Sequence, residues 1–469
     1  MKKITTLKIL LFSVGLFACT SSFAQTAPKR KVFGKEIKSV NPHNGLVRCI
    51  SDEYENSLQQ KDAKRATNEQ FEKWIAPYVE NAKSKMLSSR NSDGTAIVIN
   101  IPVVVHVIHN GDAVGTNENI TDARVLSQIT VLNQDFRRML GTPGYNTNAV
   151  GADIEIQFCM AQRKPDGTAT TGVDRVLKTT TNWSSSSSVE TMKTTTQWDP
   201  AQYFNIWTVQ FTSNLNQELG GVLGYAQFPS SSQLAGLNSN EGAANTDGVV
   251  IDWRCFGSST IAPGGTYYTD YDKGRTATHE IGHCFGLRHI WGDAGSQQDG
   301  IDCTGDDYCT DTPTAGWENY DCLQVYNSCP AAGNDMVENY MDYTNDTCMN
   351  IFTLDQKARI QAVLLNSPRR NTLGASLACQ APLGTPSFEL LQGLKLYPNP
   401  AKDVLNIAIA NGNLPDSFVI YNNLGQVITQ AKVSSENDLK VNTSSFSAGI
   451  YMIRVSKDND SKTLQFIKN

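Results

Sequence analysis

The chain has 469 residues, of which 40% are hydrophobic and 18% charged, a globular composition that excludes a largely disordered protein. This length exceeds one ordinary hydrophobic core, so we expect two or more domains. Forty Lys and Arg against 46 Asp and Glu give a net charge of -6. This charge argues against nucleic acid as a partner, because nucleic-acid-binding proteins usually carry a basic surface.

The N-terminus has the pattern of a signal peptide. Basic residues precede an apolar run over 9–19, and a small-residue cleavage site ends at Ala24. The apolar run is too short to span a bilayer, and the bulky Phe17 disfavours lipidation at the nearby Cys19. We therefore expect residues 1–24 to be removed during export. No later stretch of the sequence is apolar enough to cross a membrane.

Residues 25–95 differ in composition from the chain that follows. They are rich in Lys, Asn, Gln and Ser, and apolar residues at helical spacing predict one helix over 68–86. The segment ends in a polar run over 88–94. We interpret it as a pro-segment followed by a cleavable linker.

A second domain is predicted over 96–379. Its first strand is the β-branched run over 97–107, and Thr121 is placed to cap an amphipathic helix that extends to about residue 140. The serine run over 184–188 is typical of a loop. Further strands are predicted over 154–160, 204–211, 222–228 and 248–253, and further helices over 272–287 and 353–365.

The first of these two later helices carries a zinc-binding pattern. His279 and His283 are four residues apart and therefore share one helix face, while Glu280 projects nearby and can take a proton from a metal-bound water. Gly286 lets the chain turn out of the helix, which brings His289 round as a third ligand. Three protein ligands and one open position are typical of a catalytic zinc.

A methionine turn and several further motifs carry a family resemblance. Met341 follows the zinc-binding pattern as the Met-turn does in metzincins. The motifs of a closer resemblance are 275–278, 288–293, 311–313 and 339–343. Over about residues 97–370 the chain resembles the pappalysin (cytophagalysin) metalloproteases. The resemblance implies an α+β catalytic domain with a mixed twisted sheet, a backing helix, a zinc helix, a Met-turn and a disulfide-rich C-terminal subdomain.

The same resemblance implies roles for single residues. Met341 forms an apolar floor under the zinc, and the Tyr343 hydroxyl stabilises the oxyanion of the transition state; the alternative for Tyr343 is a buried structural tyrosine. A structural calcium ion is implied at the acidic loop, with Asp307, Asp311 and the Thr312 carbonyl as ligands. The alternative there is a solvated acidic loop without an ion.

Cysteines crowd into the stretch after the zinc helix. Five lie between 303 and 348, which indicates disulfides in an exported chain. The alternative is a second, structural zinc site, which would favour CxxC pairs, and the sequence contains none. The resemblance implies the pairs Cys303–Cys329 and Cys322–Cys348, and Cys284–Cys309 is expected as an extra pair beyond that pattern. Cys159, Cys255 and Cys379 are left without assigned partners.

One cysteine of the pro-segment has a possible inhibitory role. Cys49 follows Arg48, and its thiolate could fill the open zinc position until the pro-segment is removed. Pappalysin-like zymogens resemble this arrangement. Ile50 stands where that family tends to have Gly, which departs from the pattern. The alternative is an unpaired or intermolecular cysteine.

The C-terminal part is predicted to be a separate β-sandwich. Residues 380–393 form a linker, and short alternating strands with turn signals fill 394–469. Its motifs include 397–400, 423–425 and 447–451, which resemble the sorting domain of type IX secretion. The alternative is a carbohydrate- or protein-binding sandwich.

These patterns together predict a secreted zinc endopeptidase made as a latent zymogen. Its expected partners are protein or peptide substrates and the type IX secretion machinery, and we expect a monomer that is extracellular or attached to the cell surface. Residues 344–348 are expected to line the S1′ pocket, where Asp346 favours a basic P1′ side chain. Two alternatives are a non-enzymatic adhesin on the same fold and a zinc hydrolase of non-peptide amides.

Overall fold

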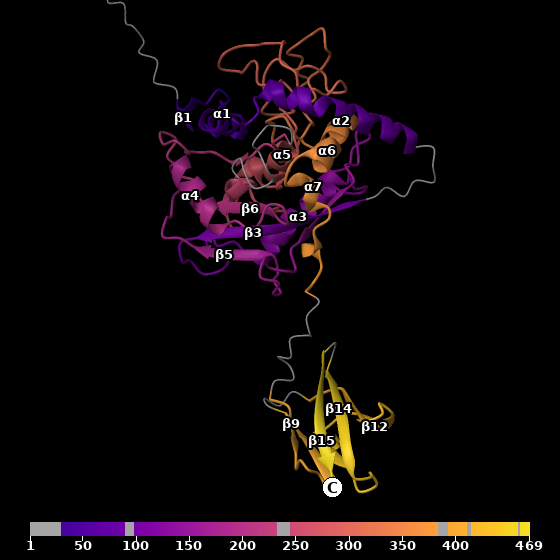
Figure 1. The fold of residues 1–469 in the computed structure, drawn as a ribbon. Helices are drawn as coiled ribbons and strands as arrows, with labels where there is room; N and C mark the ends of the chain where they lie inside the picture. The colour runs from indigo at the N-terminus through magenta and orange to yellow at the C-terminus, as the bar shows by residue number, and fades with distance from the viewer. Residues whose placement is uncertain (1–29, 90–97, 232–243, 383–392, 410–413, 458–459) are drawn as a thin grey trace, which may run out of the picture. The chain divides into compact units, whose positions relative to one another are not determined.

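The computed structural model describes residues 30–89, 98–231, 244–382, 393–409, 414–457 and 460–469. The predicted signal peptide 1–24 and most of the predicted linker lie outside these residues. The chain divides into two compact units, 1–381 and 382–469, which are described separately (Figure 1).

The first unit is organised around a mixed β-sheet. The first half of β3 (Ile99–His109) pairs in parallel with β4 (Ile156–Met160), and its second half pairs with β5 (Val173–Leu177). On the other side of β3 the order is β6 (Phe204–Val209), β8 (Val249–Asp252) and β7 (Gly224–Ala226). Only β7 runs antiparallel to its neighbour, and it forms the edge of the sheet.

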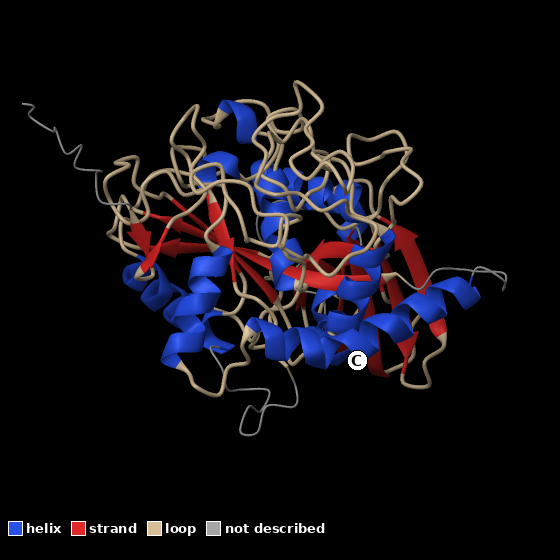
Figure 2. Ribbon diagram, turned by 90° about the horizontal axis from the view of Figure 1, so that it is seen from above, coloured by secondary structure: helices blue, strands red, loops and turns tan. Residues whose placement is uncertain are grey.

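Helices cover both faces of this sheet (Figure 2). The apolar faces of α3 (Asp122–Phe136) and α5 (Arg275–Cys284) share one core cluster with alternate residues of β3. On the opposite face, Val189 and Met192 of α4 (Ser186–Thr196) pack against β6 and β8. The α+β architecture with a mixed sheet and a backing helix is therefore confirmed.

Several helix predictions needed correction. Residues 25–95 contain a helix over Ser51–Lys61 that was not predicted, and the helix expected to extend to about residue 140 ends at Phe136. The serine run that we expected to be a loop contains the start of α4, because the Glu218 carboxylate accepts hydrogen bonds from the Ser186 amide and hydroxyl. The zinc helix is shorter than predicted and begins at Arg275, since Gly274 has a left-handed conformation with φ of 83°. A contact from a residue 32 positions away is not visible in local sequence.

Residues 30–89 lie against the rest of the first unit. They form β1 (Lys31–Val32), β2 (Lys35–Glu36), α1 (Ser51–Lys61) and α2 (Asn68–Ser89). Apolar residues of α2 share a buried cluster with α6 (Leu354–Asn366), and Figure 1 shows the two helices side by side. Glu72 of α2 forms ion pairs with Arg359 at 2.5 Å and Arg288 at 3.4 Å. The helix α7 (Arg370–Leu373) follows α6.

Disulfides hold the stretch between α5 and α6, which contains no helix or strand in the described chain. The pairs Cys303–Cys329 and Cys322–Cys348 are present, as is Cys159–Cys379, which joins residues 220 positions apart. The expected pair Cys284–Cys309 is wrong, since both are buried free thiols. The Cys284 sulfur lies 3.6 Å from the Gly248 carbonyl at the sheet, on the face of α5 that enters the core.

The second unit is a small all-β sandwich. One antiparallel sheet has the order β13 (Lys440–Asn442), β10 (Val404–Ala408) and β9 (Lys395–Tyr397). The other has the order β12 (Val427–Lys432), β11 (Ser417–Asn422), β14 (Gly449–Lys457) and β15 (Asp460–Lys468). Residues of both sheets fill one apolar core.

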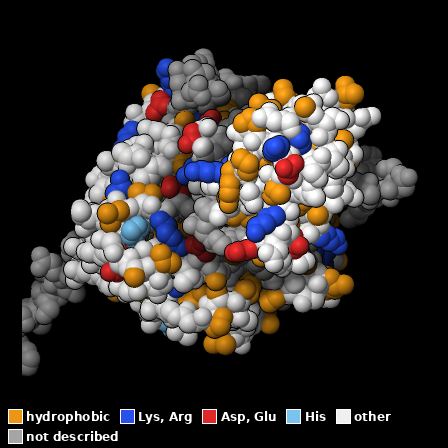
Figure 3. All heavy atoms as spheres, turned by 90° about the horizontal axis from the view of Figure 1, so that it is seen from below, with side chains coloured by type: hydrophobic (Ala, Val, Ile, Leu, Met, Phe, Trp, Pro, Cys, Tyr) orange, Lys and Arg blue, Asp and Glu red, His pale blue; other side chains and the backbone are white. Residues whose placement is uncertain are grey.

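The surface carries charged side chains of both signs. On the face drawn in Figure 3, positive and negative side chains are interspersed, with hydrophobic side chains between them. Among the described residues, no helix is both long and apolar enough to span a bilayer.

Candidate active site

Three imidazoles converge at a buried point beside the sheet. His279 and His283 lie on α5, whose residues are all buried, and His289 follows the helix. The three Nε2 atoms are 3.0 to 3.3 Å from one another. Zinc–nitrogen bonds of about 2.0–2.1 Å place tetrahedral ligands about 3.4 Å apart. The spacing of the nitrogens therefore fits a zinc ion.

The opposite ring nitrogens fix how each imidazole is protonated. The Nδ1 atoms of His279 and His283 contact the carbonyls of Tyr340 at 2.7 Å and Leu287 at 2.9 Å, so each is the N–H donor. His289 Nδ1 lies 2.6 Å from an Asp293 carboxylate oxygen. Each Nε2 lone pair is thus free to bind a cation. Burial and the neighbouring histidines hold the pKa of His279 well below its usual range, which keeps it neutral.

Two glycines make this geometry possible. Gly286 has a φ of 89°, which ends the helix and turns the chain toward His289. A Cβ at Gly282 would lie 2.5 Å from the Met341 sulfur. Met341 therefore packs directly beneath the helix between the two ligand positions, where the resemblance placed an apolar floor.

Glu280 lies in the same pocket and is fully buried. Its Oε2 accepts a hydrogen bond from the Ser51 hydroxyl at 2.8 Å and lies 3.3 Å from the Cys49 sulfur. Its Oε1 is buried without a hydrogen-bond partner. Burial raises the pKa of Glu280 to about 8, against the lowering effect of Ser51 and Cys49. A carboxylate with this pKa can both accept and return a proton near neutral pH.

The Tyr343 hydroxyl faces the same space. It donates to the Cys49 carbonyl at 3.3 Å, and its ring packs against His289 with centroids 4.9 Å apart. Burial raises the pKa of Tyr343 well above its usual range, so the phenol stays a neutral donor.

Cys49 completes the group of possible metal ligands. Its sulfur and one nitrogen of each histidine lie within 4.8 Å of one another, and all four residues are buried. Burial and the Glu280 carboxylate raise the pKa of the Cys49 thiol well above its usual range, so a cation at the histidines is needed to favour the thiolate. Ile50, at the position where the family tends to have Gly, is buried in the apolar cluster on the outer face of the sheet.

Arg48 enters a second buried position next to the histidines. Its guanidinium forms an ion pair with Asp346 at 3.1 Å, and neither side chain is exposed. The other Asp346 oxygen accepts hydrogen bonds from the amides of Lys273 and Arg275, just before and at the start of α5. The sequence indicated Asp346 but not its partner. It placed Asp293 in a family motif without a role, and it gave no signal for Ser51.

The carboxylates of the acidic loop, the expected calcium ligands, converge less closely than the ligands at the histidines. Both oxygens of the buried Asp307 accept hydrogen bonds within the loop, from the Cys309 amide and the Thr312 hydroxyl. Asp311 accepts from the Asp355 amide with one oxygen, while its other oxygen is buried without a partner. Burial raises the pKa of Asp307 to about 7. Within the described chain, no three acidic residues of this loop converge as the group at the histidines does.

These features together define a metalloprotease of the metzincin class. They are the mixed sheet, the helix with two histidines and a glutamate, the third histidine after a glycine turn and the methionine beneath the helix. Residues 256–365 match the peptidase family described as pregnancy-associated plasma protein-A. An extracellular metalloprotease of Verticillium alfalfae is 32% identical over 283 residues, which are 60% of this chain and 80% of the relative. The chain belongs to this family, the pappalysins.

Solved structures agree with this assignment. Mature mirolysin of Tannerella forsythia in complex with a cleaved peptide is 35% identical, with a TM-score of 0.50 over 62% of this chain and 99% of that one. A promirolysin mutant is 33% identical, with a TM-score of 0.51 over 70% of this chain and 97% of that one.

The second unit matches a different family. Residues 395–469 correspond to the secretion system C-terminal sorting domain. The protein is therefore a secreted metalloprotease that carries a type IX sorting domain.

Proposed function

We propose that the protein is a zinc endopeptidase that hydrolyses extracellular proteins and is made as a latent zymogen. The observation that carries this proposal is the convergence of the Cys49 sulfur with the nitrogens of His279, His283 and His289. The three imidazoles are the proposed ligands of the catalytic zinc, and Cys49 is the ligand of the latent form.

In the proposed reaction, each side chain acts on a different proton or charge. When bound, zinc supplies a Lewis acid for the scissile carbonyl and makes a water molecule more acidic. Glu280 takes the proton of the attacking water and gives it to the leaving amine. The Tyr343 hydroxyl donates to the carbonyl oxygen as it becomes negative. Its present hydrogen bond to the Cys49 carbonyl supports this role.

Latency follows from how the pro-segment occupies the cleft. Val47 bridges in parallel to Val222, next to β7, and the Ser51 hydroxyl accepts from the Ala226 amide. An edge strand is where an extended peptide substrate adds its own backbone hydrogen bonds. The pro-segment thus blocks the metal, the general base and the edge strand together. The larger share of this chain that promirolysin covers supports the same proposal.

The ion pair of Arg48 with Asp346 supports a preference for a basic P1′ residue. The arginine lies beside Cys49, in a fully buried position with one carboxylate. A buried carboxylate needs a partner once the pro-segment has left. We therefore assign Asp346 as the base of the S1′ pocket.

We also propose a structural calcium at the acidic loop, with Asp307, Asp311 and the Thr312 carbonyl as ligands. The buried Asp311 oxygen without a partner supports this proposal, because hard cations are bound by such oxygens.

The proposed domain boundaries are those expected from the sequence. Residues 25–95 are the pro-segment, 96–379 the catalytic domain, 380–393 the linker and 394–469 the sorting domain, and the protein is proposed to act as a monomer.

Replacing Glu280 by Ala tests the protease itself. We expect the activated variant to lose about 10²- to 10⁴-fold in kcat/KM on casein, because no other group takes the proton, while its zinc content by mass spectrometry stays at one ion. Wild-type cleavage is expected to stop with chelator. An activated wild-type protein without chelator-sensitive cleavage would leave the adhesin and the non-peptide hydrolase as the better interpretations.

Replacing Cys49 by Ser tests latency. The uncut variant should hydrolyse a small fluorogenic peptide at least about tenfold faster than the uncut wild type, because a hydroxyl is a much poorer zinc ligand than a thiolate. Gels must show an intact chain during the assay. Cys255→Ser is the control, since Cys255 is a second buried free thiol outside the group at the histidines. Equal latency in the wild type and Cys49→Ser contradicts the switch.

Replacing Asp346 by Asn tests the S1′ assignment. We expect kcat/KM for peptides with Arg at P1′ to fall at least about thirtyfold, because a buried charge loses its partner, while peptides with Leu at P1′ change little. Asp270→Asn is the matched control, because Asp270 is exposed and contacts Asp346 only through its backbone carbonyl. An unchanged ratio of Arg to Leu cleavage would remove Asp346 from the pocket.

Calcium binding is tested by thermal unfolding. After treatment with a calcium-selective chelator, added calcium should raise Tm in the wild type, since a ligand that binds the folded state stabilises it. Asp311→Asn should reduce this rise. A rise of the same size in both proteins places the ion elsewhere, and no rise in the wild type argues for the loop without an ion.

A further inference from the structure

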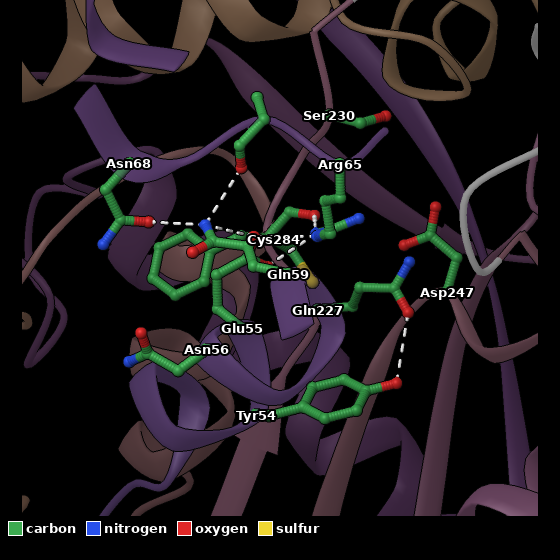
Figure 4. Close-up of polar contacts among 12 residues, drawn as sticks. Tyr54, Glu55, Asn56, Gln59, Arg65, Asn68, Gln227, Ser230, Asp247 and Cys284 are labelled. Atoms are coloured by element: carbon green, nitrogen blue, oxygen red, sulfur yellow. Dashed lines mark hydrogen bonds and ion pairs between the residues drawn. The ribbon is translucent and has the colours of Figure 1, made fainter. Parts of the chain in front are cut away.

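Beyond the zinc site, one pro-segment side chain fills a polar pocket on the outer face of the sheet. Tyr54 of α1 is buried, and Figure 4 shows its hydroxyl directed toward Gln227. The hydroxyl donates to the Glu190 carboxylate of α4, and its oxygen also lies 3.2 Å from the Thr246 hydroxyl and 3.3 Å from Gln227 Oε1. The three polar partners of the hydroxyl follow the proposed cleavage region, whereas Phe33 of the pro-segment itself packs against the Tyr54 ring with centroids 4.7 Å apart.

Outside the pro-segment, one wall of this pocket is aromatic and its base is charged. The Tyr225 ring meets the Tyr54 ring edge-on, with centroids 5.2 Å apart. Glu190 Oε1 accepts from the Tyr225 hydroxyl at 2.7 Å and from the Lys193 ammonium at 2.9 Å. Its Oε2 is the acceptor for Tyr54. Once α1 has left, Glu190 Oε2 loses the Tyr54 hydroxyl as its donor, whereas Glu190 Oε1 keeps Tyr225 and Lys193.

This charge arrangement distinguishes among side chains. The buried Lys193 ammonium lies 4.8 Å from the centre of the Tyr54 ring, so a cationic side chain would be repelled there. An acidic side chain would meet the Glu190 carboxylate. A phenylalanine ring would fill the pocket but leave Glu190 Oε2 without its donor, which is costly in a buried site. Tyrosine supplies both an aromatic ring for this space and a neutral O–H donor for Glu190 Oε2.

The pocket lies along the edge strand on the side of the zinc opposite the S1′ position. Along the pro-segment, Arg48 comes before Cys49 and pairs with Asp346, the proposed base of the S1′ pocket. Ser51 comes after Cys49 and contacts Ala226 of the edge strand β7. Along β7, a Cβ at Gly224 would face Glu280, whereas Tyr225 packs in the outer cluster. An extended peptide on this edge directs alternate side chains to the two faces. Every second residue would therefore point to the side of Tyr225.

We propose that the pocket of Tyr54 is a substrate subsite for a tyrosine side chain on the N-terminal side of the scissile bond, with Glu190 as its specificity-determining residue. The pro-segment holds this subsite with Tyr54 as it holds the S1′ position with Arg48. The inference rests on the proposed function, because it requires that the pro-segment leaves on activation.

The test compares peptides with the activated wild-type enzyme. All peptides carry Arg at P1′, and Tyr, Phe, Ala or Arg is placed at the second, third or fourth residue before the scissile bond. We expect Tyr to exceed Phe by about tenfold in kcat/KM at one of these positions, since a hydrogen bond to a buried carboxylate is gained. Equal rates for Tyr, Phe and Ala at every position overturn the subsite.

Two variants locate the effect. Glu190→Gln should reduce the Tyr-to-Phe ratio to about threefold or less while cleavage of the Ala peptide persists, since a neutral amide is a weaker acceptor. Loss of this charge removes the ion-pair partner of the buried Lys193. Thr246→Val therefore provides a second change beside the same hydroxyl that alters no charge. A Tyr preference that neither variant alters assigns it to another pocket. Cleavage of no peptide, including the Ala reference, would instead overturn the proposed function.

Discussion

The approach of three imidazole nitrogens within 3.3 Å of one another is the constraint on which the rest of the catalytic unit depends. Such an arrangement requires neutral rings with a fixed tautomer. Buried carbonyls and one carboxylate supply the acceptors that hold the outer nitrogens. The helix must lie against the sheet, end at Gly286 and rest on Met341. The disulfide-linked loops and the methionine turn are therefore parts of a support for these rings.

The proposed pro-segment, residues 25–95, complements these supporting groups in charge as well as in shape. It presents a thiol to the imidazoles, a hydroxyl to Glu280 and a guanidinium to Asp346. Each group meets a partner of complementary chemistry in a buried place, where an unpaired polar group is costly. If the protein is made as the proposed zymogen, a substrate would need to replace these contacts in the cleft.

The sequence was sufficient for the features that depend on local pattern. The zinc helix, its glycine turn and most strands of the sheet follow from spacing and side-chain type, since periodicity reports which face is buried. It was insufficient where distant residues decide. The start of α4 depends on Glu218, the disulfide of Cys159 joins Cys379, and the direction of Cys284 depends on how α5 meets the sheet. Ser51 joins the site only through the fold, and the role of Asp293 as the partner of His289 became visible only there.

The contact of α2 with α6 has a consequence for how inhibition ends. Apolar side chains and the ion pairs of Glu72 with Arg359 and Arg288 hold this helix independently of the chain connection to β3. A single cut between α2 and β3 would turn an intramolecular inhibitor into a two-chain complex, whose stability is set by dilution rather than by tethering. The fraction of cut molecules that stay closed would then depend on concentration, because a released pro-segment rebinds more often in a concentrated secretion than after dispersal in the medium.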